Sequence, residues 1–185
     1  MKLGSKIFHD LIIKIDNTND KLLKLFFLHL TSNKTTMSTN QVKLHRVFTA
    51  PVEKVYKAFT DADAMAYWLP PYGFLCKVHS MDFKLGGTFK MSFTNFSTGH
   101  GHSFGGEYVD IIPNERIVYT DQFDDPNFPG LITTTVELKQ VICGTELIAT
   151  QEGIPAMIPV EMCYLGWQES LEKLKRLVET TIPDA

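Results

Sequence analysis

The last third of the chain contains the pattern that most constrains its fold, a single long amphipathic helix. Between Ile158 and Thr180, apolar residues recur at steps of three and four, and the positions between them carry glutamate, lysine and arginine. This spacing places the apolar side chains on one face of a helix. We therefore expect the helix to lie on a large apolar surface, a curved sheet wrapped around it, with room for a ligand between them. The apolar face comprises Val160, Cys163, Trp167, Leu171, Leu174 and Val178.

Residues 42–71 have the pattern of one strand followed by two short helices. Residues 42–48 alternate between apolar and polar as a half-buried strand does. Pro51 follows and is suited to the first turn of a helix, where its missing N–H costs nothing. Asp61 is a suitable N-cap for a second helix, which Pro70 and Pro71 end.

A change of period after residue 71 predicts a run of strands. Apolar residues now alternate with polar ones, and glycine, proline and asparagine occur where hairpin turns would fall. The expected order is one strand, two helices, about six strands and the long helix. Consecutive hairpins give an antiparallel sheet of six to seven strands, so the predicted class is α+β. The clearest alternating runs are 89–94, 117–123, 132–138 and 147–151, and the turn signals are Gly86-Gly87, Pro113-Asn114, 124–130 and Cys143-Gly144.

Composition excludes several classes of function. The net charge of −3 and the three widely separated arginines leave no basic patch for nucleic acid. Three cysteines without Cys-x-x-Cys spacing argue against a disulfide framework or a structural zinc site and fit a reducing cytoplasm. No apolar run reaches the roughly 18 residues that a membrane span needs. We expect no nucleic-acid partner, no membrane span and a cytoplasmic protein.

Residues 1–36 differ from the rest, being rich in Lys, Asn, Ile, Leu and Phe and lacking Pro, Ala, Val and Trp. A targeting signal is disfavoured because acidic residues precede the apolar run at 22–30 and Lys24 interrupts it. Two alternatives are translation that starts at Met37 and an amphipathic appendage that docks on a partner. We favour a dispensable or spurious extension, followed by one domain over residues 37–185.

Several motifs in the order of this chain resemble those of a known superfamily. The chain is similar to START-like, helix-grip (SRPBCC) proteins, in the branch of bacterial domains like the C-terminal domain of the heat-shock-protein-90 ATPase activator. The resemblance implies a helix-grip fold and a hydrophobic cavity. The superfamily includes lipid carriers, metabolite receptors, cyclases and co-chaperone domains, so fold alone does not select a function. The matching motifs are Arg46–Pro51 with Val55-Tyr56, Thr60-Asp61 leading to Tyr67-Trp68, Asp82–Gly87, Gly106–Thr120, Gly144–Leu147, Gln151–Gly153 and Gly166-Trp167.

Aromatic and methionine residues with a few polar ones are the candidates for lining that cavity. An apolar enclosure with a few polar groups is typical of small-molecule sites, and the same residues could instead only fill the core. Methionine adapts to ligands of varied shape. The candidates are Trp68, Phe74, Met81, Met91, Phe93, His102, Phe104, Tyr108, Tyr119, Asp121, Phe123, Gln151, Met157, Met162 and Trp167.

Four polar residues are considered for chemistry. His100 and His102 have the i, i+2 spacing that points two strand side chains to one side, but no third ligand is fixed by spacing. Residues 98–106 look like a flexible hairpin tip, so these histidines are either solvated or, for His102, at the cavity mouth. Asp121 and Gln151 fall on the apolar parity of their strands. Burial would raise the pKa of Asp121, unless the residue is instead wet or shifted by a bulge. We expect no metal and no cofactor.

Three classes of function remain. The first is a module that binds a small apolar or amphipathic molecule, which best fits a largely aromatic interior set with few ionisable groups. The second is a cyclase- or hydrolase-type enzyme that uses Asp121, Tyr119 or His102 as an acid or base. The third is an interaction domain for a chaperone or stress partner. The oligomeric state is either monomer or homodimer, and catalytic residues are not assigned.

Overall fold

The computed structural model describes residues 40–182, and within that range it contains seven strands and three helices. Their order is one strand, two short helices, six strands and a long helix, as the alternation of periods predicts. The strands are β1 (Val42–Phe48), β2 (Phe74–Met81), β3 (Thr88–Asn95), β4 (Gly101–Ile112), β5 (Arg116–Phe123), β6 (Ile132–Val141) and β7 (Gly144–Glu152). The helices are α3 (Val52–Thr60), α4 (Ala62–Trp68) and α5 (Val160–Glu179).

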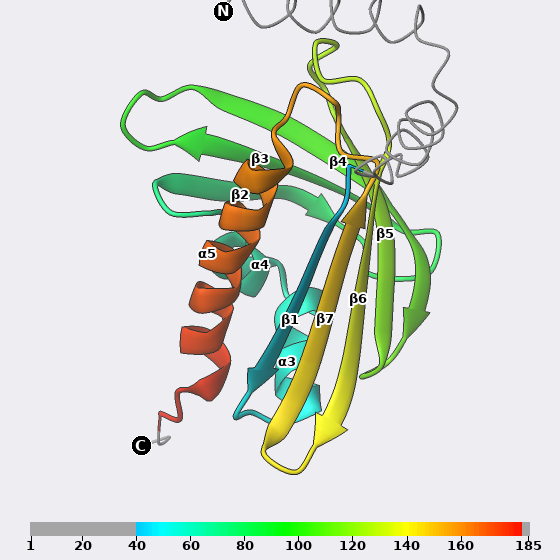
Figure 1. Ribbon diagram of the computed structural model, residues 1–185, viewed down its shortest axis with the longest axis vertical. Coiled ribbons are helices and arrows are strands. Elements are labelled where there is room, and N and C mark those ends of the chain that lie inside the picture. The colour runs from blue at the N-terminus through cyan, green and yellow to red at the C-terminus, as the bar shows by residue number, and fades with distance from the viewer. Residues whose placement is uncertain (1–39, 183–185) are drawn as a thin grey trace, which may run out of the picture. The chain divides into compact units, whose positions relative to one another are not determined.

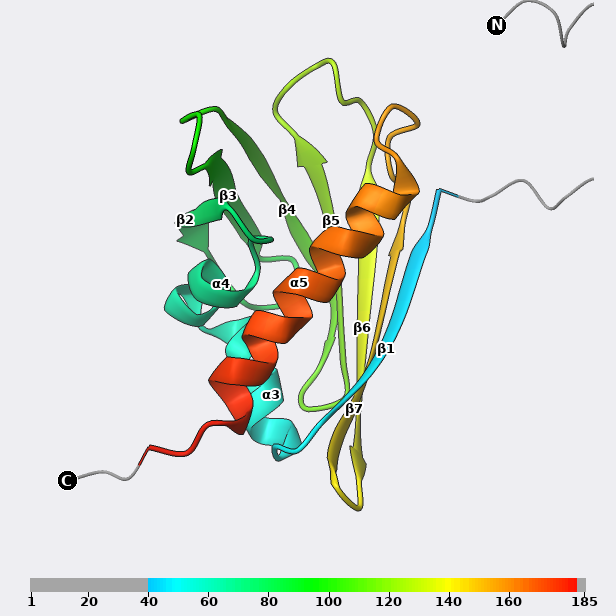
Figure 2. The same cartoon turned by 60° about the vertical axis from the view of Figure 1, so that its left-hand side comes forward.

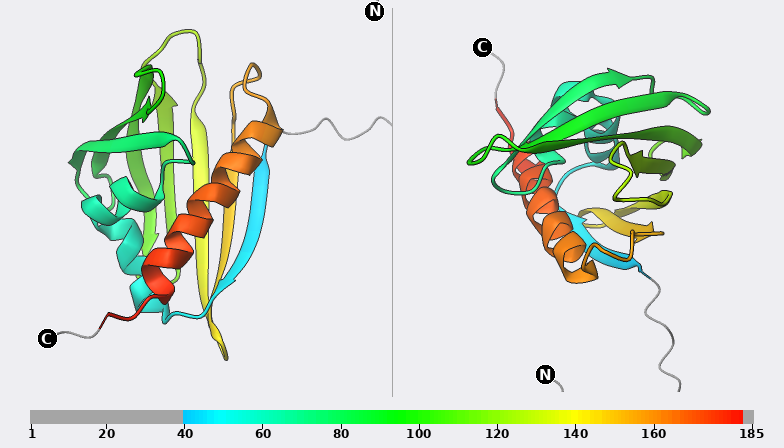
Figure 3. Two further views of the ribbon diagram at one scale, coloured as in Figure 1. Left: turned by 90° about the vertical axis from the view of Figure 1, so that its left-hand side faces the viewer. Right: turned by 90° about the horizontal axis from the view of Figure 1, so that it is seen from above.

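The strands of residues 40–182 form one antiparallel sheet in the order β1-β7-β6-β5-β4-β3-β2. Each strand pairs with its neighbour in the chain, except that β1 closes the far edge against β7. The sheet curls, and α5 lies across its concave face with α3 and α4 beside it (Figure 1 and Figure 3). The predicted α+β helix-grip fold is confirmed.

The helix boundaries follow from local chemistry. Pro51 precedes α3 as its N-cap residue, in extended backbone, and Pro159 does the same for α5. Asp61 caps α4 as predicted, because its Oδ1 accepts hydrogen bonds from the backbone N–H groups of Asp63 and Ala64, each at 3.0 Å. These caps separate the two short helices and fix where each begins.

The glycines of β4 have a different role from the one expected. Residues 98–106 were expected to form a hairpin tip, but β4 begins at Gly101, so this prediction is wrong for most of the segment. A Cβ on Gly105 would lie 2.6 Å from the carbonyl oxygen of Phe89. One on Gly106 would lie 1.6 Å from that of Thr120. These glycines therefore permit close approach of β4 to both neighbouring strands, and His102 belongs to a strand rather than a loop.

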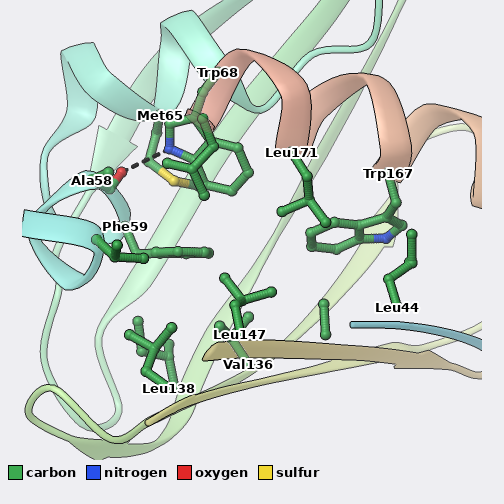
Figure 4. Packing of buried hydrophobic residues seen from close by; sticks show 14 of the residues in the cluster. Leu44, Ala58, Phe59, Met65, Trp68, Val136, Leu138, Leu147, Trp167 and Leu171 are labelled. Atoms are coloured by element: carbon green, nitrogen blue, oxygen red, sulfur yellow. Dashed lines mark hydrogen bonds between the residues drawn. The ribbon is translucent and has the colours of Figure 1, made fainter. Parts of the chain in front are cut away.

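The core lies between α5, α3 and the concave face of the sheet, chiefly at β1, β6 and β7. The predicted apolar face of α5 is buried at Trp167, Leu171, Leu174 and Val178, whereas its first two members, Val160 and Cys163, are half-buried. Figure 4 shows Trp167 and Leu171 pointing from α5 toward the side chains of β1, β6 and β7. The long helix is thus held chiefly by its C-terminal two-thirds.

The expectation for residues 1–36 lies outside the described residues. Within residues 40–182, no helix is both long and apolar enough to cross a membrane.

Candidate ligand cavity

A cavity of about 420 Å³ lies between the concave face of the sheet and the N-terminal half of α5. Its walls come from strands β2 to β7, from α3, α4 and α5, and from the segments that join α4 to β2, β5 to β6 and β7 to α5. The β3–β4, β5–β6 and β7–α5 connections gather at one end of the domain (Figure 2). Loops therefore surround this end of the cavity, while the packed core closes the other.

Twelve of the fifteen candidate residues line this cavity. Whether they contact a ligand stays a prediction. They come from strands on the concave face and from α5, as the alternation and the helical period indicate. The twelve are Phe74, Met91, Phe93, His102, Phe104, Tyr108, Tyr119, Asp121, Phe123, Gln151, Met162 and Trp167.

The other three candidates lie elsewhere. The ring of Trp68 is completely buried in the core against Phe59, with ring centroids 4.8 Å apart. Its Nε1 donates to the carbonyl oxygen of Ala58 at 2.8 Å (Figure 4). Met81 packs against the core at the end of β2, and Met157 is 55% exposed in the turn before α5.

Several lining residues had no signal in the sequence. Phe128 lies in the β5–β6 loop and Ile154 in the β7–α5 segment, where neither a helical nor a strand period exists. Ile158 also lines the cavity from that segment, because α5 begins at Val160 and not at Ile158. The β7–α5 segment is fixed by Asn40, whose Nδ2 donates to the carbonyl oxygen of Ile154 at 2.9 Å. Ser170, a buried polar residue of α5, also lines the cavity and donates to the carbonyl oxygen of Leu69 at 2.6 Å.

A row of polar side chains runs across three neighbouring strands, and its two outer members line the cavity. Tyr119 of β5 pairs with Thr134 of β6, which in turn pairs with Gln151 of β7. Gln151 accepts a hydrogen bond at 3.2 Å from Nε1 of Trp167 on α5. The row thus links the sheet to the long helix, and it places hydroxyl and amide groups inside a mostly apolar space.

Asp121 lies on the same face as Tyr119, two residues further along β5. It is opposite Gly106 of β4 and Ile132 of β6, and its side chain lines the cavity. Its Oδ1 is buried and has no hydrogen-bond partner within residues 40–182. Burial without a partner raises the pKa of Asp121 to about 7. The interior reading of its parity is confirmed, and near neutral pH the carboxyl group exists in both protonation states.

The hydroxyl groups nearest to Asp121 are kept neutral. Burial, and then the Asp121 carboxylate, raise the pKa of Tyr119 far above its ordinary value. The nearby side chain of Thr134 lowers the pKa of Tyr119 by a smaller amount. The geometry of the two side chains falls short of a full hydrogen bond, and the buried Oγ1 of Thr134 has no other partner within residues 40–182. Burial also raises the pKa of Tyr108. Asp121 is therefore the group among these that titrates near neutral pH.

The two histidines separate. His102 lines the cavity, with its ring centroid 6.3 Å from that of Phe123 and 6.4 Å from that of Phe128. His100 lies in the β3–β4 turn and is not part of the cavity lining. No group of three or more potential metal ligands occurs among residues 40–182.

Residues 49–179 match the model of the family described as Activator of Hsp90 ATPase homolog 1-like protein. The match spans more than two-thirds of the chain, including both sides of the cavity. The chain belongs to this family. The START-like resemblance of its motifs is therefore confirmed. Comparison with curated proteins finds no match.

Solved structures agree with this family assignment. A crystal structure of a Chromobacterium violaceum protein is 53% identical, with a TM-score of 0.76, over 77% of this chain and 99% of that one. A Rhodobacter sphaeroides protein is 20% identical over 76% of this chain and 92% of that chain, with a TM-score of 0.67. An AHSA1-like protein from Aeromonas hydrophila is also 20% identical, over 75% and 92%, with a TM-score of 0.62. The last two show likeness of fold.

Proposed function

We propose that this protein binds a small apolar or amphipathic molecule in the cavity beneath α5. The observation that supports this is a space of about 420 Å³ whose walls are mostly aromatic and aliphatic side chains. Cavities of this size and composition are typical of sites for small organic ligands. The polar side chains of the lining are few, and Tyr119, Asp121 and Gln151 lie close together on β5 and β7, on either side of the buried Thr134. Such a space suits a ligand with a large apolar body and one polar end.

Two measurements on the full chain test this function. Native mass spectrometry of protein purified from cells, followed by denaturing analysis, should reveal a small molecule that is released on denaturation. The neutral fluorophore 1,6-diphenylhexatriene should also bind with a rise in fluorescence that saturates at one site. Protein that carries no releasable molecule and gives no saturable rise in fluorescence would contradict the proposal.

A pair of cysteine variants separates cavity binding from adsorption to the surface. Cys163 is half-buried and lines the cavity, whereas Cys143 is exposed in the β6–β7 turn. Cys163→Trp should fill the cavity and abolish the fluorescence rise. Cys143→Trp adds the same ring outside and should leave it unchanged. Equal behaviour of the two variants would show that the fluorophore binds elsewhere.

Asp121 also favours a second function, acid–base catalysis on the bound molecule. Its pKa of about 7 suits a group that exchanges a proton near neutral pH. An enzyme of the cyclase or hydrolase type would convert the released molecule into a product of altered mass or structure during incubation, and Asp121→Asn would stop that change. Unchanged ligand after long incubation would leave binding as the function.

Other features of the biology are supported more indirectly. A role with a chaperone or stress partner is supported by the family description alone. A cytoplasmic, bacterial setting fits the free cysteines Cys76, Cys143 and Cys163. The state of assembly, monomer or homodimer, can be measured by light scattering on the same preparation.

A further inference from the structure

One polar group in the cavity lacks a partner that would explain its burial. Gln151 accepts from Trp167, and Ser170 donates to the backbone of Leu69, so each has a structural role. The carboxyl group of Asp121 has none, because its Oδ1 is enclosed and unpaired within residues 40–182. A buried acceptor without a donor destabilises the protein, and more so when it is charged. Such a group is explained when a ligand supplies the missing donor.

Aromatic residues line the cavity together with Asp121. Tyr119 and Phe123 are its neighbours on the same face of β5. Across the strand pair, the ring centroid of Phe104 lies 6.3 Å from that of Phe123. Tyr108 of β4 pairs with Tyr119. Aromatic faces attract cations, and a carboxylate among them adds an opposite charge and a hydrogen-bond acceptor.

The charged groups around this position are few in the part of the chain that the structure describes. Within residues 40–182, no lysine or arginine lines the cavity. The other titratable side chains of the lining are His102 and Tyr108 on β4, Tyr119 on β5 and Cys163 on α5. The β6 residues that face Asp121 and Tyr119 are Ile132 and Thr134, which do not titrate. A positive charge that pairs with ionised Asp121 would therefore come from the ligand.

We propose that the cavity selects an amphipathic amine, whose ammonium group pairs with Asp121 while its aromatic or aliphatic body fills the space between the sheet and α5. This inference rests on the proposed function and specifies the chemistry of the ligand's polar end. A molecule with an anionic end meets repulsion from Asp121, and one with a neutral hydroxyl end gains a weaker hydrogen bond.

The pairing has a consequence for protons. The free carboxyl group, with its pKa of about 7, is close to half protonated at pH 7. An ammonium ion binds the ionised form, so binding at pH 7 should release a fraction of a proton per ligand. Affinity for the amine should rise with pH through 7, until the amine itself loses its proton near pH 10.

Three matched compounds test the inference on the full chain: 4-phenylbutylamine, 4-phenylbutanol and 4-phenylbutyrate. At pH 8, titration calorimetry should show the amine binding about tenfold or more tightly than the alcohol, with the acid weakest. Asp121→Asn should reduce amine affinity by about tenfold and change alcohol affinity less than about twofold. Asp124→Asn is the control, since Asp124 is exposed and pairs with Lys90 outside the cavity. It should change neither.

The proton count gives a second measurement that needs no variant. Calorimetry of the amine at pH 7 in buffers of different ionisation enthalpy should report the release of a fraction of a proton per ligand, and the alcohol none. Amine and alcohol of equal affinity, or amine binding without proton release, would overturn the inference and leave the proposed function standing. Failure of all three compounds to bind or to displace 1,6-diphenylhexatriene would overturn the inference, and failure of that fluorophore to bind as well would contradict the proposed function.

Discussion

The two halves of α5 belong to one helix but face different environments. In the C-terminal half, Leu171, Leu174 and Val178 are each no more than 2% exposed against the core. In the N-terminal half, Met162 is 62% exposed, and Cys163 reaches only the side of the cavity. Trp167 lies at the boundary between them, contacting the core with its ring and Gln151 with its indole nitrogen.

The difference assigns the two halves of α5 different roles: the C-terminal half stabilises the fold, and the N-terminal half covers the cavity. Close packing at the C-terminal half supplies the apolar burial that holds the helix on the sheet. The N-terminal half can then remain loosely packed without unfolding the domain. Hydrogen bonds reinforce the anchored part, since Lys173 Nζ donates to the carbonyl oxygen of Pro70 at 2.8 Å and Ser170 to that of Leu69.

The boundary residue should show the largest effect. Trp167→Ala removes a buried aromatic ring and leaves the Gln151 side chain without its donor, so we expect a loss of roughly 3–5 kcal/mol in the free energy of unfolding. Urea denaturation measures it. An unchanged denaturation midpoint would show that the boundary is drawn in the wrong place.

A pair of variants compares the two halves directly. Leu174→Ala opens a void in the packed half and should cost roughly 2–5 kcal/mol. Met162→Ala, in the exposed half, should cost less than about 1 kcal/mol, because little apolar surface is lost from the interior. Comparable losses would mean that both halves are packed alike.

Stability should also depend on pH, because Asp121 lines the cavity beneath the N-terminal half of α5. Its pKa in the folded protein is about 7, above the value of about 4 in an unfolded chain, so folding favours the protonated form. This contribution to the free energy of unfolding is therefore full below about pH 4 and decreases as the pH rises to about 7. Asp121→Asn removes the effect, so the variant should gain roughly 2–3 kcal/mol relative to the wild type between pH 5 and pH 8. A constant difference between the two proteins over this range would contradict the burial of the charge.

A smaller loss of stability is expected from the link between the sheet and α5. Gln151→Leu keeps the volume of the side chain but removes the acceptor for Trp167 Nε1, with an expected loss of about 1–2 kcal/mol. Thermal melting at pH 6 gives the measurement, and Gln122→Leu, at an exposed position of β5, is the control. A variant as stable as the wild type would show that water or another group satisfies the indole.

The sequence predicts the regular half of the site better than the irregular half. Strand parity is sufficient to place Asp121 and Gln151 inside, because successive side chains of a strand point to opposite faces and every second residue of β5 from Ile117 lines the cavity. Strand parity does not place Met81, because the register of β2 against β3 shifts between Val78 and Ser80, and Met81 lies outside the cavity lining.

Periodicity also says nothing about loops or about which of two tryptophans faces a cavity. Phe128 and Ile154 lie in segments without a repeating pattern, so their approach to the cavity depends on tertiary structure. Trp68 and Trp167 are both on apolar helix faces. Only the packing of α4 against α3 turns the Trp68 ring toward Ala58 and away from the cavity.

The placement of these two rings gives the protein an optical signal of its own. They are the only tryptophans in the chain. Trp167 lines the cavity and should change its emission when a molecule enters, whereas Trp68, enclosed and hydrogen-bonded to Ala58, should emit constantly. The difference spectrum between empty and filled protein therefore belongs to a single indole, and unlabelled protein can report occupancy by fluorescence.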